Sequence, residues 1–252
     1  MALKEKTNKE IRQECRDYMY AMSQIPWTPS EDIDLTSIVK TLVYKKGVTY
    51  YGVMYNTYFG EAHPYTMATL EYFKTFLDEN GVYHGPIERQ GAIGNHCTSA
   101  PIVAWKHIGD AITATYSGNT QPRSGTGVLP VGDYVYQDDD VLTIKIWERN
   151  GEEKMLECLA QAQMADCVIR STFIRDNLYT GHTRMIDENV VVRDENGKID
   201  ADKSYITCLE QTWSFDKDAS VPTTWYVHHK YTYTQLKDGW IPITCQMLKG
   251  TK

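Results

Sequence analysis

The sequence predicts an α+β domain with an antiparallel sheet, and three observations lead to this fold class. Apolar residues recur at helical spacing in the first part of the chain, up to about residue 108. From about Gly127 onward, segments alternate or carry the β-branched and aromatic runs typical of strands. The pair Asn196-Gly197 between two of them is a strong signal for a tight hairpin. Because helices precede strands rather than alternating with them, the sequence favours an antiparallel sheet over parallel βαβ units.

Three helices are expected in the first part of the chain. Thr7 and Glu10 form a capping-box pair, in which each side chain satisfies the other residue's free backbone N–H. An apolar stripe at helical spacing follows, consisting of Ile11, Cys15, Met19 and Met22. A second helix is predicted over residues 66–80, with Gly81 as its stop signal. A short apolar third helix is predicted over residues 100–108.

Eight strands are expected in the second part. Their predicted ranges are 131–136, 141–147, 155–159, 166–170, 182–192, 205–213, 224–234 and 241–245. We find no internal repeat and no low-complexity linker. The whole chain, residues 1–252, is therefore expected to form a single domain.

Composition excludes several classes of protein. The 252 residues carry 26 basic and 33 acidic side chains, and the net charge of −7 argues against a broad nucleic-acid-binding or anionic-membrane surface, with a local basic patch left open. The six cysteines lie far apart without a Cys-x-x-Cys pair, which indicates neither a disulfide scaffold nor a zinc site. We expect no metal and no other cofactor.

The sequence also predicts no membrane span, because it contains no apolar run of 18 residues. Its first residues lack the apolar core of a signal peptide. The residues given leave the localisation and the oligomeric state of the protein open.

One segment has the pattern of a nucleophile, Gly91-Ala-Ile-Gly-Asn-His-Cys97-Thr-Ser-Ala100. A loop containing Gly and Asn delivers Cys97 to the start of the predicted third helix. A thiol at a helix N-terminus feels the positive end of the helix dipole, which lowers its pKa and favours the nucleophilic thiolate. A structural role for Cys97 is the alternative hypothesis.

A nucleophilic cysteine needs a base, and the base needs an orienting group. His182 opens a predicted strand directly after a loop, where its side chain could face a cleft. His228 and His229 are adjacent on another strand, so they are predicted to point to opposite faces and cannot form one site together. A later strand carries Glu210 and Gln211 in an otherwise apolar run, and the hairpin signals put it beside the strand of His182.

The order of these residues resembles that of the papain-like bacterial cell-wall peptidases of the NlpC type and the related CHAP amidases. In that group the nucleophile lies in a motif such as Asp-Cys-Ser-Gly/Ala at a helix start, and His96-Cys97-Thr98-Ser99-Ala100 is similar to it, with His96 in place of the Asp. The segment Leu209–Trp213 resembles the strand on which CHAP-type enzymes carry a Glu, then an Asn, before a Trp. A Gly-Asp strand start usually precedes the histidine, and both Gly132-Asp133 and the degenerate Ala165-Asp166 look like it.

The resemblance implies a papain-like fold with Cys97 as nucleophile, His182 as base and Glu210 as orienting group, with Gln211 as the alternative. Strand alternation favours Glu210, because Gln211 shares its face with the apolar residues Leu209 and Trp213. A carboxylate can also stabilise an imidazolium by charge, which an amide cannot do.

Members of this group commonly carry a Tyr upstream of the nucleophile, in a Gly-x-Pro-Tyr-like segment near the substrate groove. Lys46-Gly47-Val-Thr-Tyr50-Tyr51-Gly-Val-Met-Tyr55 is similar to that segment, and the resemblance implies that Tyr50, Tyr51, Tyr55 and His96 contact substrate. The alternative is a hairpin of core tyrosines. Residues 1–30 then form an N-terminal helical extension, and residues 56–90 form a helical insertion.

The implied reaction is thiol-mediated hydrolysis of an amide bond in a peptide, plausibly a peptidoglycan stem peptide. Two backbone N–H groups around Cys97 are expected to form the oxyanion site. An acyltransferase or lipid amidase on the same scaffold is one alternative. A catalytically silent module that binds peptides or glycans in a Tyr-rich groove is another.

Overall fold

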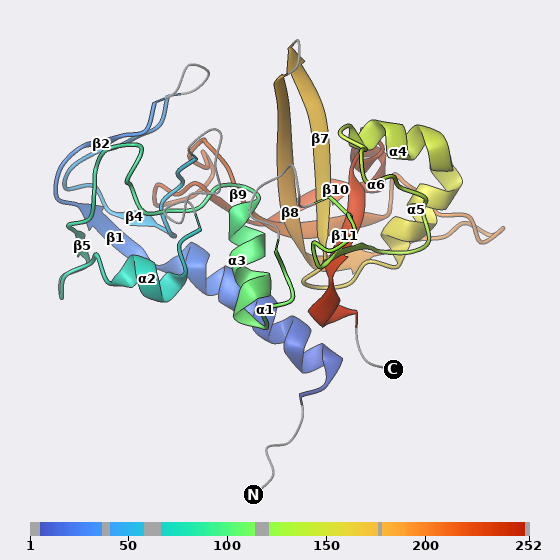
Figure 1. Cartoon of the computed structure of the whole chain (residues 1–252), viewed down its shortest axis with the longest axis horizontal. Helices are drawn as coiled ribbons and strands as arrows, with labels where there is room; N and C mark the ends of the chain where they lie inside the picture. Colours follow the sequence, from blue (N-terminus) through green and yellow to red (C-terminus); the bar gives the residue numbers. More distant parts are fainter. Residues whose placement is uncertain (1–5, 37–40, 58–66, 114–120, 176–177, 250–252) are drawn as a thin grey trace, which may run out of the picture.

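The computed structural model is a mixed α+β fold and describes residues 6–36, 41–57, 67–113, 121–175 and 178–249 (Figure 1). Its main element is a sheet of six strands in the order β10-β9-β8-β7-β11-β6, in which every neighbouring pair is antiparallel. The strands are β6 (Val128–Pro130), β7 (Cys167–Arg175), β8 (Leu178–Val190), β9 (Tyr205–Gln211), β10 (Trp225–Thr232) and β11 (Ile241–Cys245). The predicted α+β class with an antiparallel sheet is confirmed.

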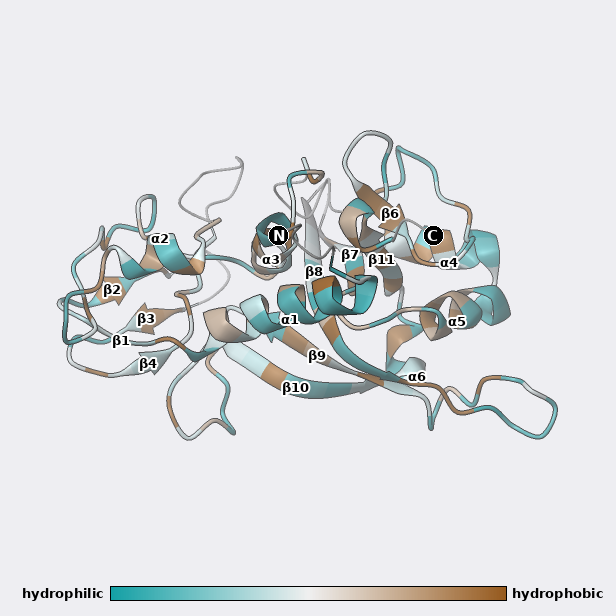
Figure 2. Ribbon diagram, turned by 90° about the horizontal axis from the view of Figure 1, so that it is seen from below, coloured by the Kyte–Doolittle hydropathy of each residue, from teal (hydrophilic) through white to brown (hydrophobic). Residues whose placement is uncertain are grey.

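Helix α1 (Asn8–Gln24) begins where the capping box predicts. The Thr7 hydroxyl accepts from the Glu10 N–H, and the Glu10 carboxylate accepts from the Thr7 N–H. The predicted apolar stripe buries Cys15, Met19 and Met22 completely. Figure 2, seen from below, shows α1 running along the sheet near β9 and β10, and α1 also packs on α3 (Ser99–His107).

A buried ion pair fastens α1 to the sheet. The Arg12 guanidinium lies 2.8 Å from Asp166, the residue before β7, and both side chains are almost fully buried. Arg12 also donates to the carbonyl oxygens of Met164 and Leu248 and, through Nε, to the Asn8 side chain. A buried charge needs such partners, and here they hold the N-terminal helix on the sheet.

A smaller layer of short strands occupies the other end of the molecule (Figure 1). Strand β1 (Pro26–Pro29) lies between β4 (Tyr50–Tyr51) and β5 (Val82–Tyr83), while β2 (Ile33–Asp34) pairs with β3 (Val43–Tyr44). The buried Trp27 ring contacts the rings of Tyr44, Tyr50, Phe73 and Tyr83. This aromatic cluster is the core of the smaller layer.

Two predicted strands are wrong, because residues 141–147 and 155–159 lie in the helices α4 (Thr143–Asn150) and α5 (Glu152–Ala160). The β-branched and aromatic residues of 141–147 favour a strand, but in both segments the buried residues follow helical spacing. In α4 these are Thr143, Ile146 and Trp147, and in α5 they are Met155, Leu156, Cys158 and Leu159. Gly151, with φ of +80°, separates the two helices.

Two other predicted elements also differ from the structure. Residues 131–136 form no strand, because Gly132 turns the chain with φ of +80° directly after β6. A Cβ at Gly132 would lie 2.5 Å from the Cys158 sulfur, so only glycine fits there. The predicted helix over 66–80 is the shorter α2 (Leu70–Lys74), and residues 58–66 of the predicted insertion lie outside the described residues.

The remaining described elements are the short helix α6 (Tyr233–Leu236) and a 3₁₀ turn over Gln246–Leu248. The Asn196-Gly197 turn forms as predicted, with Gly197 at φ of +80° and a bridge between Arg193 and Ile199. Among the helices of the described ranges, none has both the length and the apolar character needed to cross a bilayer.

Candidate functional site

The loop before α3 is fixed by pairing with the segment Met54–Asn56. The Asn95 N–H donates to the Met54 carbonyl at 2.9 Å, and the Asn56 N–H donates to the Asn95 carbonyl at 2.8 Å. A Cβ on Gly94 would lie only 2.3 Å from the Met54 carbonyl oxygen, so the close approach of the two backbones requires glycine. This pairing sets Tyr55 beside the loop that carries Cys97.

His96 caps the start of α3. Its Nδ1 accepts from the N–H groups of Thr98, at 3.3 Å, and Ser99, at 3.4 Å. In return, the Ser99 hydroxyl accepts from the His96 N–H at 2.8 Å. These contacts satisfy first-turn N–H groups that the helix geometry leaves without intrahelical partners. His96 thus does the work of a side-chain cap at the position where the resembling enzymes carry Asp.

The start of α3 docks directly on β8. The Cys97 sulfur lies 3.5 Å from the Gly181 carbonyl oxygen, and the hydroxyls of Thr98 and Thr183 lie 3.1 Å apart. Between these two contacts is His182, whose interaction with the Cys97 thiol shifts the pKa of both groups. The structure therefore brings together the two residues that the sequence selected from opposite halves of the chain.

The Glu210 carboxylate bonds to the other side of the His182 ring. Its Oε2 is hydrogen-bonded to His182 Nε2 and accepts from Arg184 Nε at 2.9 Å. Its Oε1 accepts from the Tyr231 hydroxyl. His182 and Arg184 stand two residues apart on β8 and so project to the same side, next to Glu210 on β9. We call His182, Arg184, Glu210 and Tyr231 the Glu210 cluster.

The pKa values of Cys97 and His182 are shifted toward an ion pair. Burial alone would raise the pKa of the Cys97 thiol, but hydrogen bonds to His182 and His96 outweigh it and hold that pKa well below its ordinary value. Burial would lower the pKa of His182, but its bonds to Cys97 and Glu210 raise it to about 9. Both shifts favour a thiolate beside an imidazolium.

Glu210 is the buried counter-charge of this pair. Its side chain is 2% exposed, and burial would raise the pKa of the carboxyl. Hydrogen bonds to His182 and His229 and the charge of Arg184 overcome burial and hold the pKa well below its ordinary value. The carboxylate is therefore ionised and aimed at the imidazole.

Gln211 is buried on the other side of the strand. Its side-chain amide donates to the Val53 carbonyl at 2.7 Å and to the Thr224 hydroxyl at 3.4 Å. Gln211 has no contact with His182 and instead fastens the segment that leads to Tyr55. Of the two neighbours, the structure puts Glu210 at the imidazole.

The three tyrosines of the upstream segment have different surroundings. Tyr55 is buried, and its hydroxyl bonds to both the thiol and the backbone N–H of Cys97; burial first, then the charge of Cys97, raises the pKa of Tyr55 far above its ordinary value. Tyr50 packs in the aromatic cluster around Trp27, and its hydroxyl accepts from the Lys45 N–H. Tyr51 is 40% exposed and lines a separate pocket with Trp225. Only Tyr55 of the three contacts Cys97.

Sequence reasoning missed three members of the site: Arg184, Tyr231 and His229. Arg184 could have been found from its spacing, because it lies two residues beyond His182 on the same strand. His229 was set aside together with His228, and the two do point to different partners, but His229 Nδ1 lies 3.5 Å from Glu210. A bulge in β10 between Val227 and His229 shifts this register, and no sequence signal marks it.

Cys97 differs from the other five cysteines. All are free thiols, but burial raises the pKa of each of the other five, which are Cys15, Cys158, Cys167, Cys208 and Cys245. Within the described ranges, no group of three or more His, Cys, Asp or Glu side chains could hold a metal ion.

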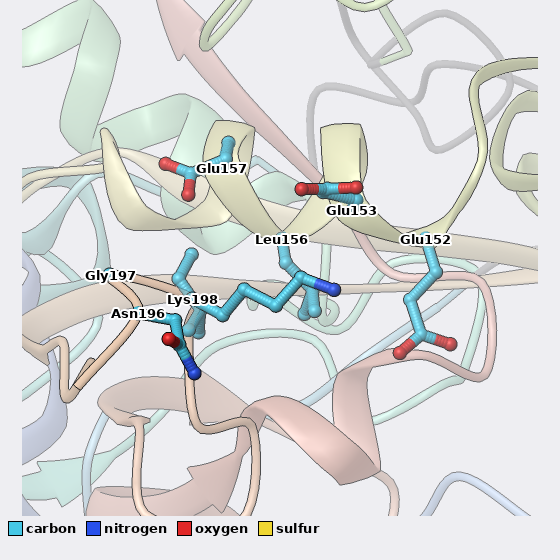
Figure 3. A pocket seen from close by; sticks show the side chains of 8 residues that line it. Glu152, Glu153, Leu156, Glu157, Asn196, Gly197 and Lys198 are labelled. Carbon is cyan, nitrogen blue, oxygen red and sulfur yellow. The ribbon is translucent and has the colours of Figure 1, made fainter. Parts of the chain in front are cut away.

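Two pockets of about 340 Å³ lie on the surface. One is lined by the Glu210 cluster together with Trp213, Tyr226 and His229. Cys97 is not among its lining residues. The other lies between α5 and the Asn196-Gly197 turn, where Figure 3 shows Glu152, Glu153 and Glu157 on one side and Lys198 on the other. This second pocket has no contact with the thiol.

Comparison with known proteins gives no relative: no protein-family model, no curated protein and no solved structure matches the chain.

Proposed function

We propose that the protein is a cysteine hydrolase, a peptidase or amidase, with a papain-like arrangement of Cys97, His182 and Glu210. The observation that carries this proposal is that the His182 ring bonds to the Glu210 carboxylate while the Cys97 sulfur lies against Gly181, the residue before His182 on β8. Because Nε2 pairs with Glu210, Nδ1 is the nitrogen that serves Cys97. A helix that carries the thiol at its start and packs on an antiparallel sheet supports the papain-like reading of the fold.

In the proposed reaction the Cys97 thiolate attacks the carbonyl carbon of an amide, and the C–N bond then breaks. The proton held by His182 passes to the leaving amine, which departs and leaves a thioester on Cys97. Neutral His182 next takes a proton from water, the resulting hydroxide attacks the thioester, and the carboxylic acid and the thiolate are released. Glu210 stabilises the imidazolium at the start and end of this cycle.

The oxyanion of the tetrahedral intermediates needs a donor near Cys97. The His96 N–H is already bonded to the Ser99 hydroxyl. The Tyr55 hydroxyl interacts with the Cys97 sulfur in the free protein, and it can turn its proton to the substrate oxygen once the sulfur has bonded to carbon. One such donor is worth about 3 kcal/mol of transition-state stabilisation.

The proposed substrate is a peptide, with peptidoglycan stem peptides as the class to test first, on the strength of the resemblance alone. Purified protein is incubated with muropeptides, and the products are identified by mass spectrometry. We expect a mass gain of one water split between two products for the wild type and none for Cys97→Ala. Products that carry an added amine in place of water would indicate acyl transfer.

A probe that needs no substrate tests the chemistry separately. Iodoacetamide labelling at neutral pH, followed by peptide mapping, reports the reactivity of all six thiols in one chain. We expect Cys97 to react well ahead of the other five, which are its internal controls. Equal labelling of the six would favour a catalytically silent binding module.

A further inference from the structure

Arg184 lines a pocket, and its guanidinium is held there by two aromatic rings and a carboxylate. Its guanidinium carbon lies 3.6 Å from the centre of the Tyr231 ring and 3.8 Å from that of the Trp240 ring. The side chain is 14% exposed, and its Nε donates to Glu210 Oε2 at 2.9 Å. A planar guanidinium suits this arrangement, because it can stack on two rings and still donate in its own plane.

The Trp240 ring also touches His182, which it meets edge to face with ring centres 5.9 Å apart. Tyr231 in turn both stacks on Arg184 and donates to Glu210. The two aromatic residues that hold Arg184 therefore contact its neighbours as well. The position of Arg184 is coupled to that of the imidazole through Trp240 and to that of the carboxylate through Tyr231.

The charges around Glu210 come from three strands. On β8 they are His182 and Arg184, and on β10 they are His229 and the hydroxyl of Tyr231. On β9 itself the nearest titratable group is the Cys208 thiol, which stays protonated because burial raises its pKa well above the ordinary value. Two more distant carboxylates act on these neighbours of Glu210. The charge of Asp187 raises the pKa of Cys208, and the charge of Asp216 raises the pKa of His229.

Among the buried charges, the cluster is balanced only when Arg184 is present. The Cys97 thiolate and Glu210 are two buried negative charges, and His182 and Arg184 are the two most buried positive charges that face them. His229 is half-exposed and so contributes less. Without Arg184, the buried site would hold one negative charge in excess, which protonation of the thiolate or of Glu210 would relieve.

We propose that Arg184 is a positioning residue, which keeps Glu210 ionised and in place at His182 and through His182 keeps Cys97 in its thiolate form. The inference rests on the proposed function for its chemistry, and it adds a fourth residue that touches neither the thiol nor the scissile bond. Tyr231 assists by fixing the Arg184 plane and bonding the second carboxylate oxygen.

The test is the pH dependence of iodoacetamide labelling at Cys97, because that rate follows the thiolate fraction. Arg184→Met keeps much of the length of the side chain and removes the charge and the donors. We expect the acid limb of its profile to move to higher pH by roughly one unit, which slows labelling about tenfold at pH values below the midpoint. Arg184→Lys keeps the charge and should recover at least half of the shift.

Lys230→Met is the matched control. Lys230 also stacks on an aromatic ring of the same sheet, with its Nζ 3.6 Å from the centre of the Tyr205 ring, but it is exposed and does not bond to Glu210. Its removal should leave the profile unchanged. An acid limb that does not move in Arg184→Met, or that moves equally in Lys230→Met, would overturn the inference.

A second variant covers the case in which Arg184→Met does not fold. If circular dichroism shows that Arg184→Met does not fold, Tyr231→Phe takes its place: it keeps the ring that stacks on Arg184, removes the bond to Glu210, and should move the acid limb in the same direction by less. An unmoved limb in a folded Tyr231→Phe variant would then count against the inference. A wild-type Cys97 with the ordinary thiol profile contradicts the proposed function instead.

Discussion

Two groups of the same three residue types, a histidine, a carboxylate and an arginine, include residues of the same sheet. The first is in the Glu210 cluster. The second, which we call the Asp187 cluster, consists of Arg16, Asp187 and His228: Asp187 Oδ1 accepts from Arg16 Nε and Oδ2 bonds to His228 Nδ1 at 2.6 Å. It ties α1 to β8 and β10, at bulges in both strands.

The difference between the clusters lies in burial and in the fourth partner. The carboxylate of Glu210 is 2% exposed and the His182 ring 26%, whereas Asp187 is 11% and His228 52% exposed. His182 has a thiol on its other side, and the pKa of both partners is shifted as a result. Proximity of histidine, carboxylate and arginine therefore does not define the candidate site. The candidate site is defined by the low exposure of its carboxylate and imidazole and by the presence of a nucleophile.

The largest effect is expected from removing the nucleophile. Cys97→Ala should lower hydrolysis at least roughly a thousandfold, because no other group can form the acyl intermediate. Labelling by iodoacetamide at neutral pH should be lost with it. If Cys97→Ala were labelled as fast as the wild type, the reactive thiol would be a different cysteine. The contrast between the two clusters would then not hold.

Neutralising each carboxylate in turn tests the comparison directly. Glu210→Gln keeps an acceptor at His182 but loses the charge, and we expect kcat/KM to fall by about 10- to 100-fold, in line with a pKa change of one to two units. Asp187→Asn should leave kcat/KM unchanged and lower the free energy of unfolding by about 1 kcal/mol, since its partners are partly exposed. Equal losses of activity in the two variants would show that burial is not what distinguishes the clusters.

The pH profile of hydrolysis gives a second contrast. The pKa of His182 is raised to about 9, so its proton is present below that pH and is lost above it. Protonation of the leaving amine then fails, and kcat/KM should fall about tenfold per pH unit above 9. On the acid side the rate falls as the Cys97 thiolate is protonated, at a pH well below the ordinary thiol value. His228→Gln should change neither limb.

Much of the site follows from local sequence signals. The capping box begins α1, the Gly-Asn-His-Cys segment delivers the thiol to a helix start, and strand alternation separates Glu210 from Gln211. Each of these inferences depends on residues a few positions apart. Local chemistry is enough to decide them.

The remaining features depend on contacts between distant segments. The requirement for glycine at position 94 comes from the Met54 carbonyl, and the different surroundings of Tyr50 and Tyr55 come from Trp27 and Cys97. The β-branched and aromatic run in α4 and the short apolar run in α5 both favour strands over helices in error, because short apolar segments are ambiguous.

The smallest effect on catalysis is expected from Gln211→Ala, which tests the choice between adjacent residues of β9. Gln211 donates to the Val53 carbonyl and does not contact His182, so the variant loses buried hydrogen bonds without altering the ion pair. We expect the free energy of unfolding to fall by about 1 to 3 kcal/mol, because the Val53 carbonyl loses a buried donor while it keeps the Trp225 indole N–H at 2.9 Å. At a temperature where the variant is folded, kcat/KM and the acid limb of Cys97 labelling should stay within about threefold of wild type, a change of under 1 kcal/mol. Glu210→Ala is the comparison variant and should show the reverse order, with a large loss of rate. If Gln211→Ala remained folded but lost activity as Glu210→Ala does, the group that orients His182 would lie on the face of β9 that carries Gln211. The assignment of this role to Glu210 would then be wrong.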